Sequence, residues 1–194
     1  MSNVYVFGRE DLTDNPKLEW LIGTKIARVV YSNSVDDRQP CLIGLPTAGT
    51  ALAQAAAMAS AANGWIYPRD PIAHRIMREQ LKSHSAHQGW VNGRPDHSRQ
   101  RYWIVDNVAT DGATKIEAAT KLMADEYPAY QMPVLIYVDR QQGALQRLKN
   151  EGFEDVRVVF NLLDLTFAFG ELELWPKSAI ARVEEEIRAH QFVV

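Results

Sequence analysis

The feature that most limits what this chain can fold into is an alternation of short apolar runs with longer amphipathic segments. Short runs rich in β-branched and aromatic residues are typical of buried strands, and segments with apolar residues three or four positions apart are typical of helices. Strands that alternate with helices pair in parallel, because each helix carries the chain back across the sheet. The sequence therefore predicts an α/β fold with a mostly parallel central sheet flanked by helices.

The expected strands are rich in Val, Ile and aromatic residues, and they cover residues 4–7, 41–45, 102–105, 134–138 and 156–160. The expected helices cover residues 17–31, 51–62, 113–126, 144–151 and 179–190. Gly23 weakens the first of these helices, because glycine lowers helix stability. The apolar stretch 161–170 is expected to form helical cover for the sheet.

The composition excludes several classes of protein. The 194 residues, 46% of them hydrophobic, fit one domain with a substantial core. A net charge of −3 gives no general attraction to nucleic acid, whose binding depends on neutralising phosphates. No apolar run reaches the roughly 18 residues of a membrane span, so no membrane association is expected. A single cysteine and a start without a signal-peptide pattern favour a cytoplasmic location.

The most informative segment is an apolar strand that ends in Asp106 and Asn107 and is followed by a Thr- and Gly-rich turn over residues 110–114. Short oxygen-bearing side chains at the carboxyl edge of a parallel strand bind a ribose diol, and amides at a helix N-terminus hold a phosphate. The pattern favours a sugar-phosphate site. The alternative is an ordinary strand, turn and helix cap, because Asp and Thr are also favoured capping residues. The turn lacks the glycine patterns of triphosphate and dinucleotide loops.

The stretch over residues 101–115 resembles the 5-phosphoribosyl-1-pyrophosphate (PRPP) loop of the type I phosphoribosyltransferases. Three more segments agree, in order, with the orotate phosphoribosyltransferases of that family, and they cover residues 44–53, 78–84 and 138–143. The resemblance runs from about Cys41 to the C-terminus. It implies a type I phosphoribosyltransferase-like fold in a single domain over residues 1–194, with a small hood over about residues 1–35.

The resemblance implies which part of the substrate each segment would bind. Asp106 and Asn107 would bind the ribose hydroxyls. The turn would hold the 5′-phosphate through Thr110, Asp111, Gly112, Ala113 and Thr114. A second turn would hold pyrophosphate through the backbone amides of Thr47, Ala48 and Gly49, where small residues permit close approach. Without the resemblance, this second turn is a plain connection from strand to helix.

Arg140 lies in the Asp-Arg-Gln-Gln-Gly motif that follows the strand 134–138. The resemblance implies that it pairs with the carboxylate of orotate. A guanidinium is a planar fork, and it matches a planar carboxylate through two hydrogen bonds. The alternative is a surface arginine without a ligand.

Arg78, Lys82 and His84 match the start of the family's mobile catalytic loop, which would cover about residues 83–100. Loss of pyrophosphate builds positive charge on the ribose and negative charge on the leaving group, so nearby cations stabilise the transition state. Lys82 is the expected loop lysine, and Asp106 completes the catalytic set at the ribose. Without the resemblance, these three basic residues indicate only solvated surface.

The same resemblance implies magnesium as the cofactor, bound through PRPP rather than directly by the protein. It also implies a homodimer in which the catalytic loop is exchanged between subunits. The predicted reaction transfers the 5-phosphoribosyl group of PRPP to orotate, giving orotidine 5′-monophosphate and pyrophosphate in pyrimidine biosynthesis.

Two positions depart from the family's pattern. Asn107 stands where the family usually has a second acid, and Glu79 stands where it usually has a second basic residue. An amide still bonds a hydroxyl group but adds no negative charge beside a developing ribosyl cation. The alternatives are a phosphoribosyltransferase for another base and a noncatalytic PRPP- or nucleotide-binding regulatory protein of the same fold.

The remaining polar and sulfur-containing residues suggest no further chemistry. The histidines lack zinc-ligand spacing, and Cys41 is expected to be a buried, inert thiol. The acidic run 184–186 predicts a solvated helix face. Trp90 lies in the polar segment 83–100, where it either packs or contacts substrate or a partner subunit.

Overall fold

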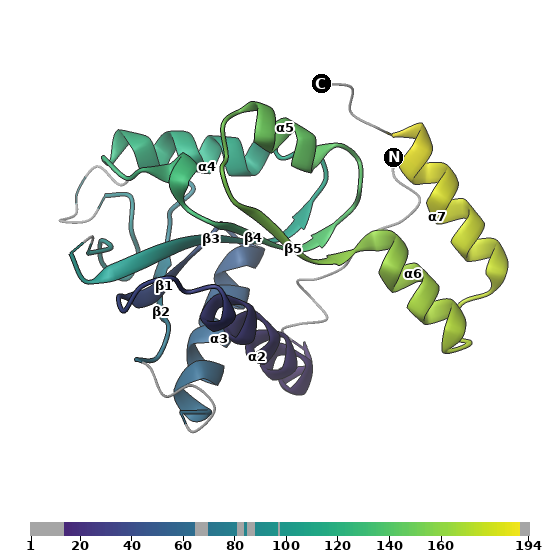
Figure 1. Cartoon of the computed structure of the whole chain (residues 1–194), viewed down its shortest axis with the longest axis horizontal. Coiled ribbons are helices and arrows are strands. Elements are labelled where there is room, and N and C mark those ends of the chain that lie inside the picture. The colour runs from purple at the N-terminus through teal and green to yellow at the C-terminus, as the bar shows by residue number, and fades with distance from the viewer. Residues whose placement is uncertain (1–13, 65–69, 81–83, 85–87, 97, 191–194) are drawn as a thin grey trace. The chain divides into compact units, whose positions relative to one another are not determined.

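A computed structural model describes residues 14–64, 70–80, 84, 88–96 and 98–190 of the chain (Figure 1). The described strands are β1 Gln39–Gly44, β2 Ala73–Ile76, β3 Gln100–Ala109, β4 Val134–Asp139 and β5 Val156–Asn161. They form one sheet in the order β2-β1-β3-β4-β5. β1 pairs in parallel with β2 and with β3, and β4 pairs in parallel with β5. The predicted α/β fold is confirmed.

The described helices are α2 Pro16–Ser32, α3 Ala48–Ala62, α4 Ala113–Ala124, the short 3-10 helix η1 Ala129–Gln131, α5 Ala144–Asn150, α6 Leu162–Glu171 and α7 Lys177–Ala189. All five helices expected from apolar spacing are present, with ends that differ by a few residues. Within the ranges that the structure describes, no helix has both the length and the apolar character needed to cross a membrane.

α2 continues through Gly23, the weak point of the sequence pattern, because this glycine faces α3. A Cβ at Gly23 would lie 2.5 Å from the backbone carbon and oxygen of Ala55. The glycine and the alanines of α3 let the two backbones approach closely. The packing between the helices therefore compensates for the low helix propensity of glycine.

Four of the predicted strands match β1, β3, β4 and β5, but β2 was not predicted. Its sequence, Ala-His-Arg-Ile, contains no apolar run, and all four of its residues are half-buried at the edge of the sheet. Backbone pairing with β1 fixes this strand where side-chain hydrophobicity does not. The strand predicted over residues 4–7 lies outside the described residues.

The chain divides by its internal contacts into two compact units, one ending at Asp106 and the other beginning at Asn107. In the first unit, α2 packs against α3, and α3 packs against β1. In the second unit, α4 and α5 lie on the same side of β4 and β5 (Figure 1). The single domain over residues 1–194 stays a prediction. Of the expected hood over about residues 1–35, the described part is mainly α2.

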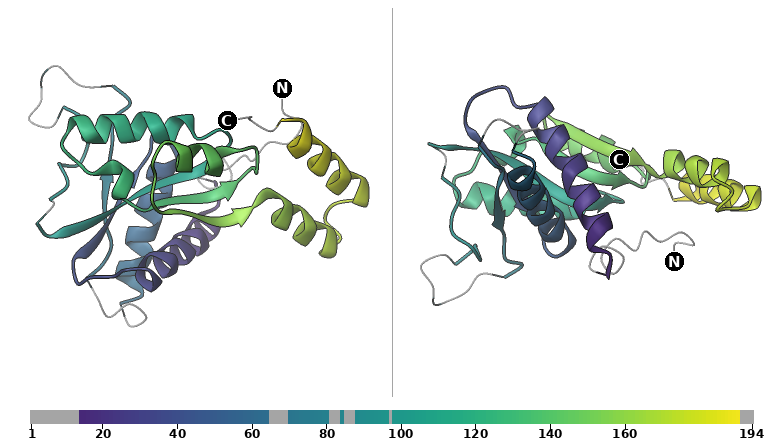
Figure 2. Two further views of the ribbon diagram at one scale, coloured as in Figure 1. Left: turned by 45° about the horizontal axis from the view of Figure 1, so that its top comes forward. Right: turned by 90° about the horizontal axis from the view of Figure 1, so that it is seen from below.

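The stretch predicted as helical cover for the sheet does form helix α6, but α6 packs mainly against α7. Leu162 of α6 forms a small core with Val183 and Ile187 of α7, and Leu163 packs against it. Figure 2 shows the two helices side by side beyond the end of β5. The helix is confirmed, and its assigned place over the sheet is wrong, because α7 offers an apolar stripe that covers it.

The segment over residues 83–100 is attached to β2 where the structure describes it. The Arg78 amide donates to the Gly89 carbonyl at 2.9 Å, and the Val91 amide donates to the Ile76 carbonyl at 2.9 Å. Trp90 is buried, with 3% of its surface exposed, so it packs within the protein. The mobility of this segment stays a prediction.

Candidate functional site

The turn from β1 to α3 packs tightly on itself at Gly44 and against the end of β3 at Gly49. The Leu45 amide donates to the Val105 carbonyl at 3.0 Å. A Cβ at Gly44 would lie 2.6 Å from the Gly49 carbonyl oxygen, and a Cβ at Gly49 would run into the Val105 carbonyl oxygen. Only glycine fits this backbone-to-backbone contact. The peptide between Pro46 and Thr47 is cis.

This packing brings the predicted pyrophosphate turn next to the predicted ribose-binding acid. A Cβ at Gly49 would lie 3.2 Å from the Cα of Asp106. Thr47 is exposed, whereas Ala48 and Gly49 are buried as the first residues of α3. The first turn of a helix presents backbone amides and the positive end of the helix dipole, which is suited to an anion.

Asp106 and Asn107 lie in β3 just past the residues that pair with β1. The pairing of the two strands ends at Gly44 and Val105. Asp106 is 6% exposed and Asn107 is half-buried. A strand that continues beyond its neighbour presents its side chains at the sheet edge where ligands bind in α/β folds.

The turn over residues 110–114 is shaped by Asp111 and Gly112. The Asp111 carboxylate accepts a hydrogen bond from the Ala113 amide at 3.1 Å. Gly112 precedes α4 with a φ of 79°, a left-handed conformation that favours glycine. Arg147 of α5 donates to the Asp111 carboxylate at 3.1 Å. A cation from a second element therefore stands at this turn and offsets the charge of Asp111.

Behind the turn, Lys115 is buried with 3% of its surface exposed. Its ammonium donates to the Val108 carbonyl at 2.6 Å and so fastens α4 to the end of β3. Burial raises the pKa of Asp139, while the Gln141 amide and the charge of Lys115 oppose that rise. Lys115 braces the predicted phosphate turn from inside the protein.

Arg140 lies beside the predicted phosphate turn, because its backbone amide donates to the Ala109 carbonyl at 3.0 Å. Its guanidinium NH2 lies 3.1 Å from the Glu186 Oε1, and the two side chains are 12% and 4% exposed. The alternative of a solvent-exposed surface arginine is wrong. The predicted solvated face over residues 184–186 is wrong for Glu186, because Arg140 compensates the buried charge.

Of the three basic residues predicted in the catalytic loop, the structure describes Arg78 and His84. Arg78 follows β2, and its Nε donates to the Trp90 carbonyl at 3.1 Å. His84 is exposed, and Lys82 lies outside the described residues. β2 is parallel to β1, so Arg78 lies at the same end of these strands as the turn at Thr47. The catalytic roles of these residues stay predictions.

Among the residues that the structure describes, no group of three or more His, Cys, Asp or Glu side chains could hold a metal ion. Cys41 is buried, and burial raises the pKa of its thiol to about 12. A thiol with such a pKa carries almost no thiolate at neutral pH, which is the form that acts as a nucleophile.

The structure thus brings the predicted residues together in two groups. The first unit places Thr47, Ala48 and Gly49 beside Asp106. The second unit places Arg140 beside the turn over residues 110–114, next to Asn107 in β3. Sequence reasoning missed Arg147 and Glu186, whose spacing from their partners along the chain gives no signal. A charged residue in the apolar stripe of α7 was the only hint of Glu186.

No family model and no curated protein matches this chain. Solved structures do match. UMP synthase of Leishmania donovani aligns over 92% of this chain at 22% identity with a TM-score of 0.67, and this chain spans only 34% of its length. Orotate phosphoribosyltransferase of Mycobacterium tuberculosis aligns over 83% of this chain and 82% of its own, at 22% identity and a TM-score of 0.63.

A third similar structure is orotate phosphoribosyltransferase of Aeropyrum pernix, at 20% identity and a TM-score of 0.59. The alignment covers 90% of this chain and 86% of that protein. These likenesses establish that the chain has the α/β fold of the type I phosphoribosyltransferases.

Proposed function

We propose that this protein is an orotate phosphoribosyltransferase, which joins orotate to PRPP and releases pyrophosphate. The observation that carries the proposal is the position of Arg140, whose backbone is bonded to the end of β3 one residue before the phosphate turn. A guanidinium on this backbone belongs to the same unit as Asn107 and the predicted phosphate turn, and it is suited to pair with the carboxylate of a base. The solved structures similar to this chain include enzymes named for this reaction.

In the proposed reaction, a ring nitrogen of orotate loses its proton and forms a bond to the anomeric carbon of PRPP. The bond from that carbon to pyrophosphate breaks, and the proton leaves with pyrophosphate or passes to solvent. Asp106 would hold the ribose hydroxyls, and its negative charge would favour the ribosyl cation that develops. The amides at Thr47, Ala48 and Gly49 would receive the pyrophosphate. The turn at residues 110–114 would fix the 5′-phosphate, so that the reacting carbon is held in place.

Magnesium fits this set of residues as a partner of the substrate. The ion usually binds to one or two carboxylates and to substrate phosphates, and it keeps several waters. Asp106 is a single buried carboxylate at the predicted ribose position. When bound to PRPP, magnesium would neutralise part of the charge on the leaving diphosphate.

The proposal includes Arg78, Lys82 and His84 as residues around the pyrophosphate, and a homodimer in which their loop reaches the partner's site. It also places the protein in pyrimidine biosynthesis and in the cytoplasm. The decisive assay follows the absorbance of orotate with PRPP and magnesium, with other bases tested in parallel. Turnover of a different base with none of orotate would replace this proposal with another phosphoribosyltransferase.

The second candidate is a noncatalytic PRPP- or nucleotide-binding protein, and Asn107 is the observation that favours it. Binding of PRPP in calorimetry, with no turnover of any base, would support this candidate. The variant Asn107→Asp, which introduces the acid that the family usually has, tests whether Asn107 limits catalysis. Its turnover should be higher if the absent negative charge is the cause.

Asp106→Ala is expected to weaken PRPP binding by about 1–3 kcal/mol, because the change removes charge-assisted hydrogen bonds to the ribose. Calorimetric titration with PRPP and magnesium measures this loss. Asp125→Ala, which removes an acid at the far end of α4, is the matched control. An unchanged affinity in Asp106→Ala would remove this residue from the site.

Arg140→Ala is expected to raise the KM for orotate about 10- to 100-fold, the cost of losing hydrogen bonds to a charged group. The KM for PRPP should change little, because the lost contact belongs to the base. Arg140→Lys keeps the charge but lacks the planar fork of the guanidinium. Its KM for orotate should therefore lie between those of the natural protein and Arg140→Ala. Steady-state kinetics with each substrate varied in turn tests this, and equal effects on both substrates would contradict the role.

A further inference from the structure

The loop between β4 and α5, which carries the Asp-Arg-Gln-Gln-Gly motif, contacts both helices of the C-terminal pair α6 and α7. The Gln141 side-chain oxygen accepts a hydrogen bond from the Leu163 amide at 3.0 Å, in the first turn of α6. Arg140, the preceding residue, donates to Glu186 of α7 at 3.1 Å. Two successive motif residues are thus bonded to two successive helices.

Gln141 is held in a fixed conformation at this junction. Its φ is 58°, and its amide donates to the Asp139 carboxylate at 3.0 Å. The Leu163 amide is one of the first-turn donors of α6 that has no partner within the helix, so the Gln141 side chain caps this end. The backbone beside Arg140 is therefore fastened from both sides.

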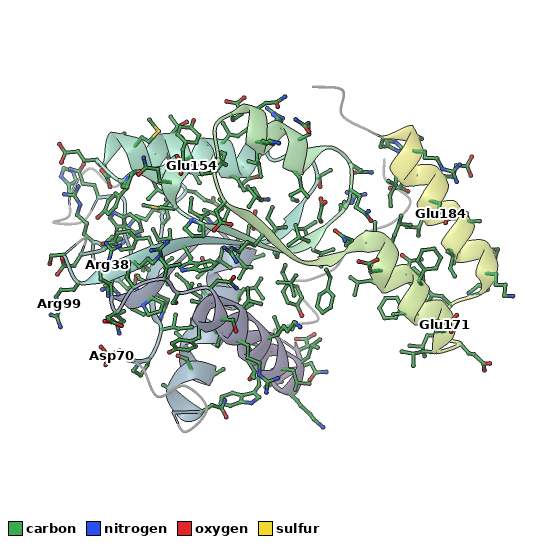
Figure 3. All side chains as sticks on the ribbon, in the orientation of Figure 1. Arg38, Asp70, Arg99, Glu154, Glu171 and Glu184 are labelled. Atoms are coloured by element: carbon green, nitrogen blue, oxygen red, sulfur yellow. The ribbon has the colours of Figure 1, made fainter. Side chains whose placement is uncertain are left out.

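Glu186 occupies the apolar face of α7. It lies between Val183 and Ile187 in the stripe that packs against Leu162, and its side chain is 4% exposed. By contrast, Glu184, labelled on α7 in Figure 3, has a partly exposed side chain that pairs with Arg188 at 3.6 Å on the same helix. A carboxylate buried in an apolar stripe is costly unless it is paired, so its place there calls for a partner such as Arg140.

We propose that Glu186 is a positioning residue for Arg140, which sets the orientation of its guanidinium toward the carboxylate of the base. This inference rests on the proposed function and adds a residue to it. An arginine side chain has many rotamers, and a buried ion pair selects one of them before the substrate arrives. Glu186 thereby makes recognition of the carboxylate depend on the α6–α7 pair.

The negative charge of Glu186 also limits which ligands Arg140 attracts. The pair has no net charge, so a ligand gains little from general attraction and must offer an acceptor that fits the guanidinium plane. A base without a carboxylate gains nothing from this contact. Loss of Glu186 should therefore affect orotate much more than PRPP.

A double-mutant cycle tests the proposal, with Glu186→Ala, Arg140→Ala, the variant with both changes, and the natural protein. Glu185→Ala is the matched control, because Glu185 is the neighbouring residue on α7 and is exposed. The KM for orotate, the KM for PRPP and kcat are measured for each, with thermal unfolding to confirm folding. If Arg140→Ala does not fold with Glu186 left unpaired, Arg140→Gln and Glu186→Gln replace the alanine variants.

Glu186→Ala is expected to raise the KM for orotate at least about tenfold, with the KM for PRPP changed less than about twofold. Glu185→Ala should change neither by more than about twofold. In the absence of Arg140, removal of Glu186 should no longer change the KM for orotate, because Glu186 acts through Arg140. A purely structural role would reduce kcat and affect both substrates, and it would persist in the Arg140→Ala background.

Besides normal kinetics in Glu186→Ala, three results would overturn the inference. They are equal effects on both substrates, the same loss with and without Arg140, and a lower KM for orotate in Glu186→Ala, which would make Glu186 a competitor. If the natural protein turns over orotate while Glu186→Ala behaves normally, only this inference fails. If the natural protein neither binds nor converts orotate, both the proposed function and this inference fail.

Discussion

Gly49→Ala is expected to destabilise the protein by about 3 kcal/mol, the upper part of the usual range for overpacking. The new Cβ would run into the Val105 carbonyl oxygen, and that oxygen already accepts a hydrogen bond from the Leu45 amide. A backbone atom cannot turn aside as a side chain can, so the turn or the strand must move. Chemical denaturation measures the loss.

The same change is expected to weaken PRPP binding in the protein that remains folded, because the turn must move away from Asp106. Gly64→Ala is the control, since the nearest atom to a Cβ there is the Ala61 carbonyl oxygen at an ordinary 3.7 Å. Its stability should change by less than about 1 kcal/mol. A Gly49→Ala protein as stable as this control would show that the turn has room for a side chain.

The parts of the fold that the sequence predicted are those set by hydrophobic pattern. β4 coincides with an apolar run, and α7 coincides with an amphipathic repeat, so both lie close to their expected positions. β2 has neither signal, because it is held by backbone pairing to β1 at an edge where half-buried polar residues are tolerated. The place of α6 depends on its packing against the next helix, α7, which the apolar pattern within residues 161–170 cannot reveal.

In the predicted site, too, the sequence predicted the local features and missed a contact between residues far apart in the chain. The strand–turn–helix order around Asp106 is local, and the sequence placed its residues correctly along the chain. The partner of Arg140 is not local, because 46 residues separate it from Glu186. A run of three glutamates resembles solvated surface, and only the packing of α7 shows that one of them faces inward.

The charges around the predicted phosphate turn bear on Asn107, which stands where the family usually has a second acid. Asp111 adds a carboxylate to this turn, but its oxygens are bonded to the Ala113 amide and to Arg147. Asp111 therefore shapes the turn and does not substitute for the acid that the family usually has at the position of Asn107. If PRPP binds here, Asp106 supplies the negative charge at the ribose, and catalysis depends more heavily on cations that stabilise the leaving group.

Lys82→Ala is therefore expected to lower kcat by roughly 100-fold or more, the scale of losing one electrostatic stabiliser. The expectation comes from the resemblance of residues 78–84 to the catalytic loop of the orotate phosphoribosyltransferases. A side chain that acts on charge developing in the transition state changes kcat more than ground-state binding, so PRPP affinity should change little. Steady-state kinetics together with calorimetry separates the two effects.

Mixed dimers of Lys82→Ala and Asp106→Ala test whether this lysine acts on the partner subunit's site. If the loop crosses between subunits, one site of each hybrid dimer has both mutations and the other site keeps both natural residues. Activity should then return, although each variant alone has little. The two chains must be coexpressed or refolded together so that subunits exchange. Hybrid dimers confirmed by differently tagged subunits, with no recovered activity, would mean that Lys82 serves its own subunit or takes no part in catalysis.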